Sequence, residues 1–225
     1  MGRRPARDAG PGGLGEVLAS PALARLVLHF VLHGHEPWHV RGLQRRSGLS
    51  MSSLNRELRR LESRGLLERM DDGGRALYRA AEHPAWKTLR QLVRDFADPA
   101  EVVEEAISGI QGIDAAFVFG SFARGDAGEH SDVDVLVVGD VEEDSALGRQ
   151  AAEASVLLGR PVEVRAYTRD RIQRQLGAGN AVLGRILAGP KRWIMGDEDR
   201  LLEITTAEGR LEPLSSFSTP VPDSV

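Results

Sequence analysis

The chain of 225 residues contains no cysteine, and aromatic residues make up only 5% of it. The lack of cysteine excludes disulfide bonds, thiol catalysis and cysteine-ligated zinc. No apolar run of about 18 residues is present, so we expect no membrane-spanning helix and no membrane partner. The first residues, MGRRPARDAGPGG, also lack the apolar segment of a secretion signal. These absences favour the cytoplasm as the location of the protein.

What the chain does contain is enough apolar sequence for a core (41%) and charge that is unevenly distributed. Residues 20–80 hold eleven arginines and six acidic residues, which gives +5, whereas residues 81–225 hold fifteen basic and twenty-five acidic residues, which gives −10. Three arginines and two acidic residues in the first nineteen positions add +1, and the sum is the net charge of −4. Length and charge together predict two domains, a basic one followed by an acidic one.

The clearest functional signal lies in residues 117–138, FVFGSFARGDAGEHSDVDVLVV. Apolar residues on either side of the polar centre predict two buried strands, the first of which ends at Gly120. Because alternate side chains of a strand share a face, Asp132 and Asp134 point the same way. Two neighbouring carboxylates repel each other unless a cation lies between them, and carboxylate oxygens suit Mg²⁺. The pair therefore predicts a divalent metal site.

The turn after the first of these strands is suited to phosphate. A glycine at a strand end, here Gly120, lets the backbone approach a ligand closely. Ser121 offers a hydroxyl at a point where a helix can begin, and helix N-termini bind phosphate through free N–H groups. Arg124 adds a positive charge in the same turn. The segment therefore predicts a phosphate cradle beside a metal-binding pair.

Gly120-Ser121, residues 122–131 and Asp132-Val133-Asp134 together resemble the signature of the nucleotidyltransferase superfamily of DNA polymerase β, and in particular its minimal nucleotidyltransferase branch in prokaryotes. The resemblance extends over about residues 100–196. It implies a small mixed sheet flanked by helices, one or two Mg²⁺ ions as cofactor, and a nucleoside triphosphate as substrate, with ATP favoured. It also implies that Asp132 and Asp134 are catalytic metal ligands and that the nucleotide is bound by Gly120, Ser121, Arg124 and Ser131.

This family places a third carboxylate on a later strand, and the candidate here is Glu163 in the segment RPVEVRAY. Val162 and Val164 would share one face of that strand, and Glu163 would point to the other. The family usually has aspartate at this position, so glutamate is a departure, although some antibiotic-modifying members resemble this chain in having it. Glu163 would be a further metal ligand or the general base for an attacking hydroxyl. The alternative is a solvated glutamate on an ordinary strand.

The basic first part of the chain predicts a DNA-binding domain. Helices are expected at 20–33, 40–47 and 51–64, followed by strands at 66–69 and 75–80 around a turn at 71–74. This order and the segment LSMSSLNRELRRLESRGLLER resemble winged helix-turn-helix domains of the arsenic-repressor and multiple-antibiotic-repressor type. The polar face of the third helix would contact double-stranded DNA through Ser52, Ser53, Arg56, Arg59 and Arg60, with Arg75 at the tip of the wing. The alternatives are a solvated helix face and a protein-interaction module.

The expected fold class is therefore α+β with two domains. We expect a disordered lead at 1–19, the winged helix at 20–82, a linker helix at 83–97, the nucleotidyltransferase domain at 98–208 and a disordered tail at 209–225. His29 and His33 have a spacing that can bind metal, but no cysteine and only Glu36 among nearby carboxylates would support such a site. His130, beside the aspartate pair, is a candidate for contact with nucleotide or an ordinary solvated loop residue.

Two functions from different classes follow from this reading. In the first, the protein is a Mg²⁺-dependent enzyme that transfers a nucleoside monophosphate to a hydroxyl acceptor and releases pyrophosphate. The resemblance allows a protein acceptor such as a toxin partner, an RNA end or a small molecule. In the second, the protein is a transcription regulator whose second domain only senses nucleotide. A scaffold that binds neither ligand is a third alternative. The winged helix predicts a homodimer on a two-fold operator.

Overall fold

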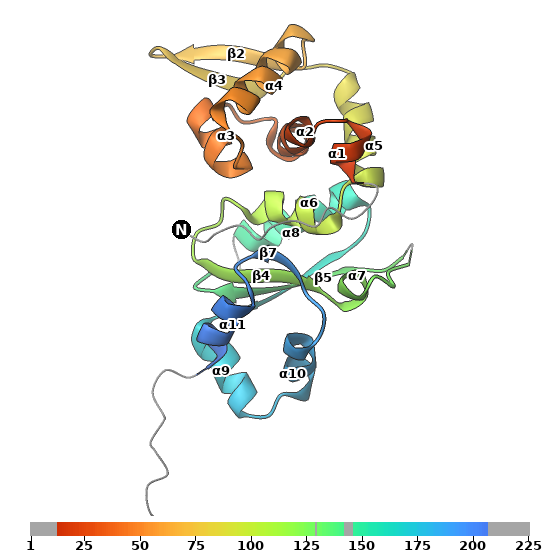
Figure 1. Cartoon of the computed structure of the whole chain (residues 1–225), viewed down its shortest axis with the longest axis vertical. Coiled ribbons are helices and arrows are strands. Elements are labelled where there is room, and N and C mark those ends of the chain that lie inside the picture. The colour runs from red at the N-terminus through yellow and green to blue at the C-terminus, as the bar shows by residue number, and fades with distance from the viewer. Residues whose placement is uncertain (1–12, 129, 142–145, 207–225) are drawn as a thin grey trace, which may run out of the picture.

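The computed structural model describes residues 13–128, 130–141 and 146–206, which form two halves stacked along the long axis (Figure 1). The first half contains α1 (Leu14–Val17), α2 (Pro21–His33), β1 (Trp38–His39), α3 (Val40–Ser47), α4 (Met51–Ser63), β2 (Leu67–Asp72), β3 (Arg75–Ala80) and α5 (Ala85–Phe96). The second contains α6 (Pro99–Ile107), β4 (Ile113–Phe119), α7 (Gly120–Arg124), β5 (Val133–Gly139), α8 (Ala146–Leu158), β6 (Val162–Tyr167), α9 (Arg169–Gly177), α10 (Ala181–Ala188), β7 (Arg192–Met195) and α11 (Glu198–Thr205). Within the described ranges, no helix has the length and apolar character needed to span a membrane.

Serine caps begin the main helices of the first half. Ser20 Oγ accepts a hydrogen bond from the Leu23 amide (3.1 Å) at the start of α2. Ser50 Oγ accepts one from the Ser53 amide (3.2 Å) at the start of α4. Such caps satisfy amides that have no partner inside the helix. The three helices expected here are confirmed to within one residue at each end.

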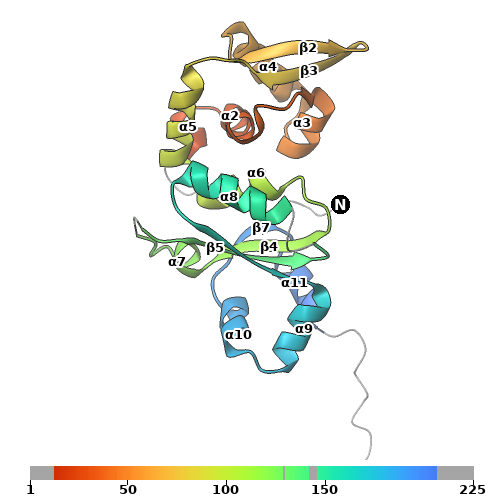
Figure 2. The same cartoon turned by 180° about the vertical axis from the view of Figure 1, so that it is seen from behind.

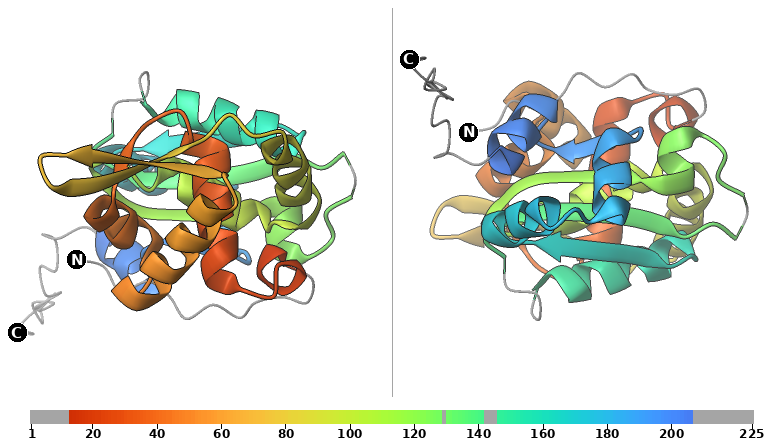
Figure 3. Two further views of the ribbon diagram at one scale, coloured as in Figure 1. Left: turned by 90° about the horizontal axis from the view of Figure 1, so that it is seen from above. Right: turned by 90° about the horizontal axis from the view of Figure 1, so that it is seen from below.

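A hairpin follows these helices. Strands β2 and β3 pair in register as far as Asp72 and Arg75, so Gly73-Gly74 alone forms the turn. The turn is therefore shorter than the expected 71–74, because Asp72 continues the pairing of β2. Strand β1 pairs with the other edge of β3, which gives a sheet in the order β1-β3-β2. Seen from above and from below, the hairpin and α7 project on opposite sides of the molecule (Figure 3).

Helix α1 lies within the segment that was expected to be disordered. Its Leu14 is only 2% exposed, and the helix packs against α2 and α5. The expectation of a disordered lead over 1–19 is wrong for this helix, because Leu14 supplies an apolar anchor that composition alone does not reveal. Residues 1–12 and the expected tail at 209–225 lie outside the described residues.

The second half is built on a mixed sheet in the order β6-β5-β4-β7. Strand β4 pairs antiparallel with both β5 and β7, and β5 pairs parallel with β6. Helices α6 and α8 cover the face toward the first half, and α9, α10 and α11 lie on the opposite side (Figures 1 and 2). The fold is therefore mixed α+β with small sheets and flanking helices, as the sequence predicts.

Alternation along β5 divides the core into two clusters. Val133, Val135 and Val137 are fully buried in the cluster that also contains side chains of α6 and α8. Leu136 and Val138 belong to the cluster on the other face, with side chains of α9, α10 and α11. A strand buried on both faces needs apolar side chains at nearly every position, as this one has. Asp134 has the parity of Leu136 and therefore lies on the α9–α11 face.

The core does not stop at the boundary between the halves. The first cluster runs without interruption from α2 and α4, through α5, to the valines of β5. In α5, Val93 is fully buried, and Trp86, Leu89 and Leu92 pack against this cluster. These side chains of the expected linker helix therefore pack within the chain, although Phe96 at the end of α5 remains 42% exposed.

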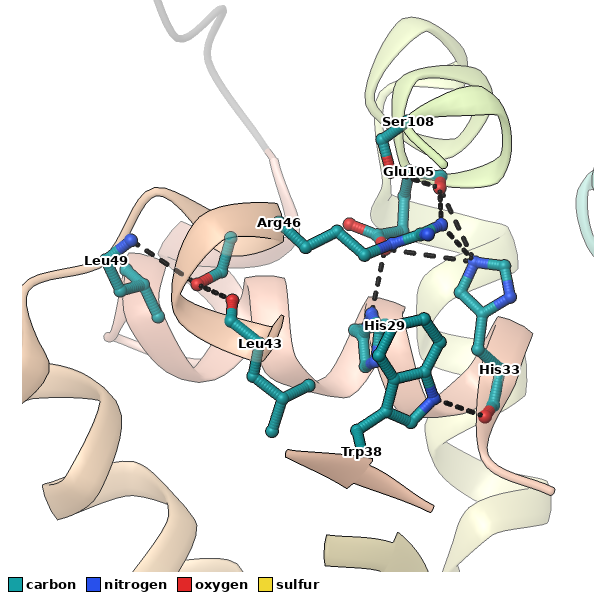
Figure 4. Close-up of polar contacts among 9 residues, drawn as sticks. His29, His33, Trp38, Leu43, Arg46, Leu49, Glu105 and Ser108 are labelled. Atoms are coloured by element: carbon teal, nitrogen blue, oxygen red, sulfur yellow. Dashed lines mark hydrogen bonds and ion pairs between the residues drawn. The ribbon is translucent and has the colours of Figure 1, made fainter. Parts of the chain in front are cut away.

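A polar cluster, formed by His29, His33, Arg46 and Glu105, also joins the two halves (Figure 4). One carboxylate oxygen of Glu105 on α6 lies 2.9 Å from His29 Nδ1 and accepts a hydrogen bond from Arg46 Nε at 2.9 Å. Arg46 Nη2 also donates to the carbonyl of Glu105 (2.7 Å) and lies 2.8 Å from His33 Nε2. The histidines therefore contact an arginine and a glutamate, and this neighbouring guanidinium disfavours a metal cation.

Burial and charge shift the pKa values in this polar cluster. Burial first, and then the positive charge of Arg46, lower the pKa of His33 from 6.5 to about 4. Burial alone would raise the pKa of Glu105, but its hydrogen bond with His29 and the charges of His29 and Arg46 outweigh this effect and hold the pKa below its usual value. Near neutral pH the cluster therefore contains an ionised glutamate and a neutral His33.

Candidate active site

The predicted site forms where β4 ends and β5 and β6 begin. In the sheet, Asp134 lies between Phe119 of β4 and Glu163 of β6. Residues that are partners across neighbouring strands point to the same face, so the side chains of Asp134 and Glu163 lie next to each other. Asp134 is half-buried, whereas Glu163 and Asp132, which directly precedes β5, are exposed. Carboxylates from two strands therefore reach one end of the α9–α11 face.

Gly120 brings the backbone into contact with this carboxylate group. It has a φ of 71°, in the left-handed region that side chains disfavour. A Cβ at this position would lie 2.5 Å from Asp134 Oδ2, closer than van der Waals contact allows. The backbone conformation and the close approach of Asp134 therefore both favour glycine in the turn from β4 into α7. This contact joins the two parts of the sequence motif in space.

The electrostatics of Asp134 indicate a site that is short of positive charge. Burial, and next the negative charge of Glu163, raise the pKa of Asp134. The charge of Asp132 acts in the same direction, whereas Arg165 and Arg124 oppose it. Burial and the neighbouring carboxylates both disfavour ionisation of Asp134, whereas a bound cation would favour its ionised form.

The residues present fit a magnesium ion. Their donor atoms are carboxylate oxygens, which are the ligands that Mg²⁺ prefers, and burial together with the neighbouring carboxylates raises the pKa of Asp134. In the part of the chain that the structure describes, no group of three or more histidine, aspartate or glutamate side chains is arranged to hold a metal ion. A Mg²⁺ site here would combine the aspartate pair with oxygens of a bound substrate, which is common for this ion.

The other expected nucleotide-binding residues lie around this centre. Ser121 is half-buried in α7, and its carbonyl accepts hydrogen bonds from the amides of Gly125 (3.0 Å) and Asp126 (3.1 Å). Arg124 is exposed and forms an ion pair with Asp126 at 3.0 Å. Ser131 Oγ accepts a hydrogen bond from the amide of residue 128 (2.9 Å), which orders the connection before the aspartates. His130 is exposed.

Sequence reasoning missed two arginines near this centre. Arg165 lies two residues beyond Glu163, on the same face of β6, and its charge reaches Asp134. Strand alternation was sufficient to find it. Arg160, between α8 and β6, contacts the connection between α7 and β5. No motif marks Arg160, because its partners are backbone carbonyls about 30 residues away in the sequence.

In the first half, most of the residues expected to contact DNA are exposed. The side chains of Ser52, Arg56, Arg59 and Arg60 on α4 are exposed, Ser53 is half-buried, and Arg75 is exposed beside the hairpin turn. Glu57, whose side chain is only 3% exposed, was missed by the sequence reasoning. It lies 3.1 Å from Arg56 Nη2 and 3.6 Å from Arg60 Nη1, so two of these arginines are partly neutralised.

Comparison with known proteins agrees with the site in the second half. Residues 100–188 match the family model of the nucleotidyltransferase domain. These residues therefore match a nucleotidyltransferase domain of the polymerase β-like type, and such a match suggests a transferase. The expected resemblance is confirmed for these residues. The match covers less than half of the chain and does not include the first half.

A solved structure described as a toxin-antitoxin with AMP-PNP is also similar to part of this chain. It is 16% identical, covers 45% of this chain and 80% of its own, and superposes with a TM-score of 0.32. A likeness of this size carries no argument about function. No curated protein sequence matches the chain.

Proposed function

We propose that the second half is a Mg²⁺-dependent nucleotidyltransferase that transfers a nucleoside monophosphate from a nucleoside triphosphate, with ATP favoured, to a hydroxyl acceptor. The contact between Gly120 and Asp134, with Glu163 as the next carboxylate in the sheet, carries this proposal. It supports a triphosphate bound against the turn into α7, within reach of a carboxylate pair. Transfer then forms a bond between the acceptor oxygen and the α-phosphorus, and pyrophosphate leaves.

Each residue has a defined role in the proposed reaction. The backbone at Gly120 and the Ser121 hydroxyl bind the β- and γ-phosphates, and Arg124 neutralises part of their charge. Asp132 and Asp134 would hold Mg²⁺, which when bound neutralises charge on the triphosphate. These groups act by stabilising the charge that develops on the transferred and leaving phosphates.

Glu163 accepts the proton of the attacking hydroxyl on a carboxylate oxygen. Its exposed position beside Asp134 supports this role, because the acceptor must approach from solvent. The alternative is that Glu163 is a third metal ligand. Glu163→Gln separates the two roles: loss of a base lowers turnover at every Mg²⁺ concentration, whereas loss of a ligand raises the Mg²⁺ concentration needed for half-maximal rate.

The acceptor is proposed to be a molecule other than DNA bound to the first half. Helices α6 and α8 lie between the first half and the sheet, and Asp134 lies on the opposite face of that sheet (Figure 1). A single ligand held on α4 would have to pass around this layer to reach the carboxylates. A protein side chain, an RNA end and a small molecule all remain acceptor classes that the arrangement accommodates.

Transfer of an α-phosphate label tests the proposal. Purified protein is incubated with Mg²⁺ and each α-labelled nucleoside triphosphate, with cell lysate as a source of acceptors. Wild type should label a macromolecule or small molecule, and the Asp132→Ala/Asp134→Ala variant should not. The control Asp140→Ala, at an exposed position just after β5, should behave as wild type. Nucleotide binding without transfer by wild type would favour the sensor-regulator instead.

We further propose that the first half is a winged helix domain that binds double-stranded DNA as a homodimer. The order α2, α3, α4, β2, β3 and the exposed arginine face of α4 support this assignment. Arg59 should contribute most among the three arginines of that face, because Arg56 and Arg60 lie against Glu57. Arg59→Ala should weaken binding and its salt dependence, and Arg149→Ala, on the exposed surface of α8, should not.

A further inference from the structure

Arg160 lies in the short connection between α8 and β6, three residues before Glu163. Its Nη1 donates to the carbonyl of Ser131 at 3.2 Å and points toward the carbonyl of Gly128 at 3.4 Å. Its guanidinium carbon also lies 5.2 Å from the centre of the Phe122 ring. One side chain therefore contacts α7 and the connection that leads from α7 to Asp132.

Two further hydrogen bonds strengthen the same junction. The amide of Val133, the first residue of β5, donates to the carbonyl of Pro161 at 2.9 Å. The amide of Gly128 donates to Ser131 Oγ at 2.9 Å and closes the turn whose carbonyls Arg160 contacts. Residues 160 and 161 thus bind the backbone on both sides of Asp132. The distance between the turn at α7 and the first aspartate depends on this bracing.

Arginine is suited to this position for geometric reasons. A planar guanidinium can stack on an aromatic ring and donate in its own plane at the same time, which an ammonium cannot do. Among the described residues, no carboxylate forms an ion pair with Arg160, so its hydrogen-bonding and stacking contacts are to carbonyls and a ring. A cation held by carbonyls next to a phosphate site also adds positive potential there.

We propose that Arg160 is a positioning residue of the nucleotide site. It holds the connection between α7 and β5 against α7, and so fixes Asp132 relative to the phosphate-binding turn at Gly120 and Ser121. This inference rests on the proposed function for its effect on nucleotide. Its effect on the connection itself does not depend on any activity and is measured separately.

The first test measures ATP binding by calorimetry in the presence of Mg²⁺. Arg160→Lys keeps the charge but loses the guanidinium that lies over the Phe122 ring, so it should weaken ATP binding about tenfold, nearly as much as Arg160→Ala. Phe122→Leu removes the aromatic surface alone and should have a smaller effect. The control Arg149→Lys, on the exposed surface of the preceding helix, should leave affinity unchanged. The thermal midpoints of all variants should stay close to that of wild type.

The second test is amide hydrogen exchange at Gly128 and Val133 without nucleotide. Both amides should exchange at least tenfold faster in Arg160→Lys and Arg160→Ala than in wild type and Arg149→Lys. Unchanged exchange, or wild-type ATP affinity in Arg160→Lys, would overturn the positioning role. If wild type itself fails to bind any nucleotide, the proposed function is wrong, while the exchange rates still decide whether Arg160 orders the connection.

Discussion

Replacing Glu105 by alanine removes the carboxylate on which His29 and Arg46 converge. The Glu105 side chain is 11% exposed, and one of its oxygens lies 2.9 Å from both His29 Nδ1 and Arg46 Nε. After the substitution, Arg46 keeps its bond to the backbone carbonyl of residue 105, but its charge loses the compensating carboxylate. Because Arg46 is only 12% exposed, water cannot replace this partner fully.

The expected cost follows from the loss of that carboxylate. Removing one partner of a buried ion pair typically destabilises a protein by about 3–5 kcal/mol. Two polar partners are lost here and some solvent reaches the site, so we expect Glu105→Ala to lower the free energy of unfolding by about 3 kcal/mol. Glu105→Gln keeps the shape and an acceptor for Arg46, and should cost about half as much. Arg46→Met should cost less in the Glu105→Ala background than in wild type, because the pair is already broken.

Urea unfolding with two probes measures this effect. Tryptophan fluorescence reports in part on the interface, because one of the three tryptophans, Trp38, has its ring centre 4.7 Å from that of His29 and 5.2 Å from the guanidinium of Arg46. Far-ultraviolet circular dichroism reports on all helices. The exposed Glu153→Ala on α8 is the matched control and should leave stability unchanged. A loss below about 1 kcal/mol for Glu105→Ala would show that the polar cluster does not hold the halves together.

Three further predictions concern the active site and pH. Gly120→Ala and Gly125→Ala both place a side chain on backbone in the left-handed region (φ 71° and 81°), and each should lower the free energy of unfolding by about 1 kcal/mol, measured by urea titration. Only the methyl group of Gly120→Ala would contact Asp134, so only this variant should also weaken ATP binding. Asp134→Asn should raise the thermal midpoint of the metal-free protein, because the raised pKa shows that ionisation opposes folding; added Mg²⁺ should then stabilise wild type but not the variant. Folding lowers the pKa of His33 from 6.5 to about 4, so as the pH falls the unfolded chain binds the proton first. The free energy of unfolding should therefore decrease by roughly 3 kcal/mol as the pH is lowered from 6.5 to 4, and His33→Gln should make this decrease smaller.

The elements that could be predicted from the sequence are those with local signals. Ser20 and Ser50 indicated where their helices begin, because an N-cap depends only on a hydroxyl and the next three residues. The aspartate pair could be placed on one strand face because alternation is a property of the strand itself. The glycine before Ser121 could be assigned to a close backbone approach, and the structure supplies the atom that it approaches, Asp134 Oδ2.

Features that depend on distant pairing could not be predicted in this way. Glu105 and Arg46 are 59 positions apart, and nothing in either local sequence indicates that they share a buried site. Glu57 is buried on α4, as are the leucines of that helix. The sequence did not assign it to the buried face, because burial is predicted from the spacing of apolar residues and glutamate is charged. The neighbourhood of Asp134 and Glu163 likewise depends on the parallel pairing of β5 with β6, which the strand patterns alone do not specify.

Strand β5 links the stability of the molecule to its proposed chemistry. Val133, Val135 and Val137 are buried under α6 and α8, in the same cluster that reaches the first half, while Asp134 on the same strand faces the candidate site. The apolar burial on one face offsets the cost of holding a half-buried carboxylate next to Glu163 on the other. A strand fixed on both faces has little freedom to move, so the adjustable parts of the site are its turn at Gly120 and the connection that Arg160 contacts. Precision at the site therefore depends on the bracing of this connection, and the position of Asp134 depends on the core.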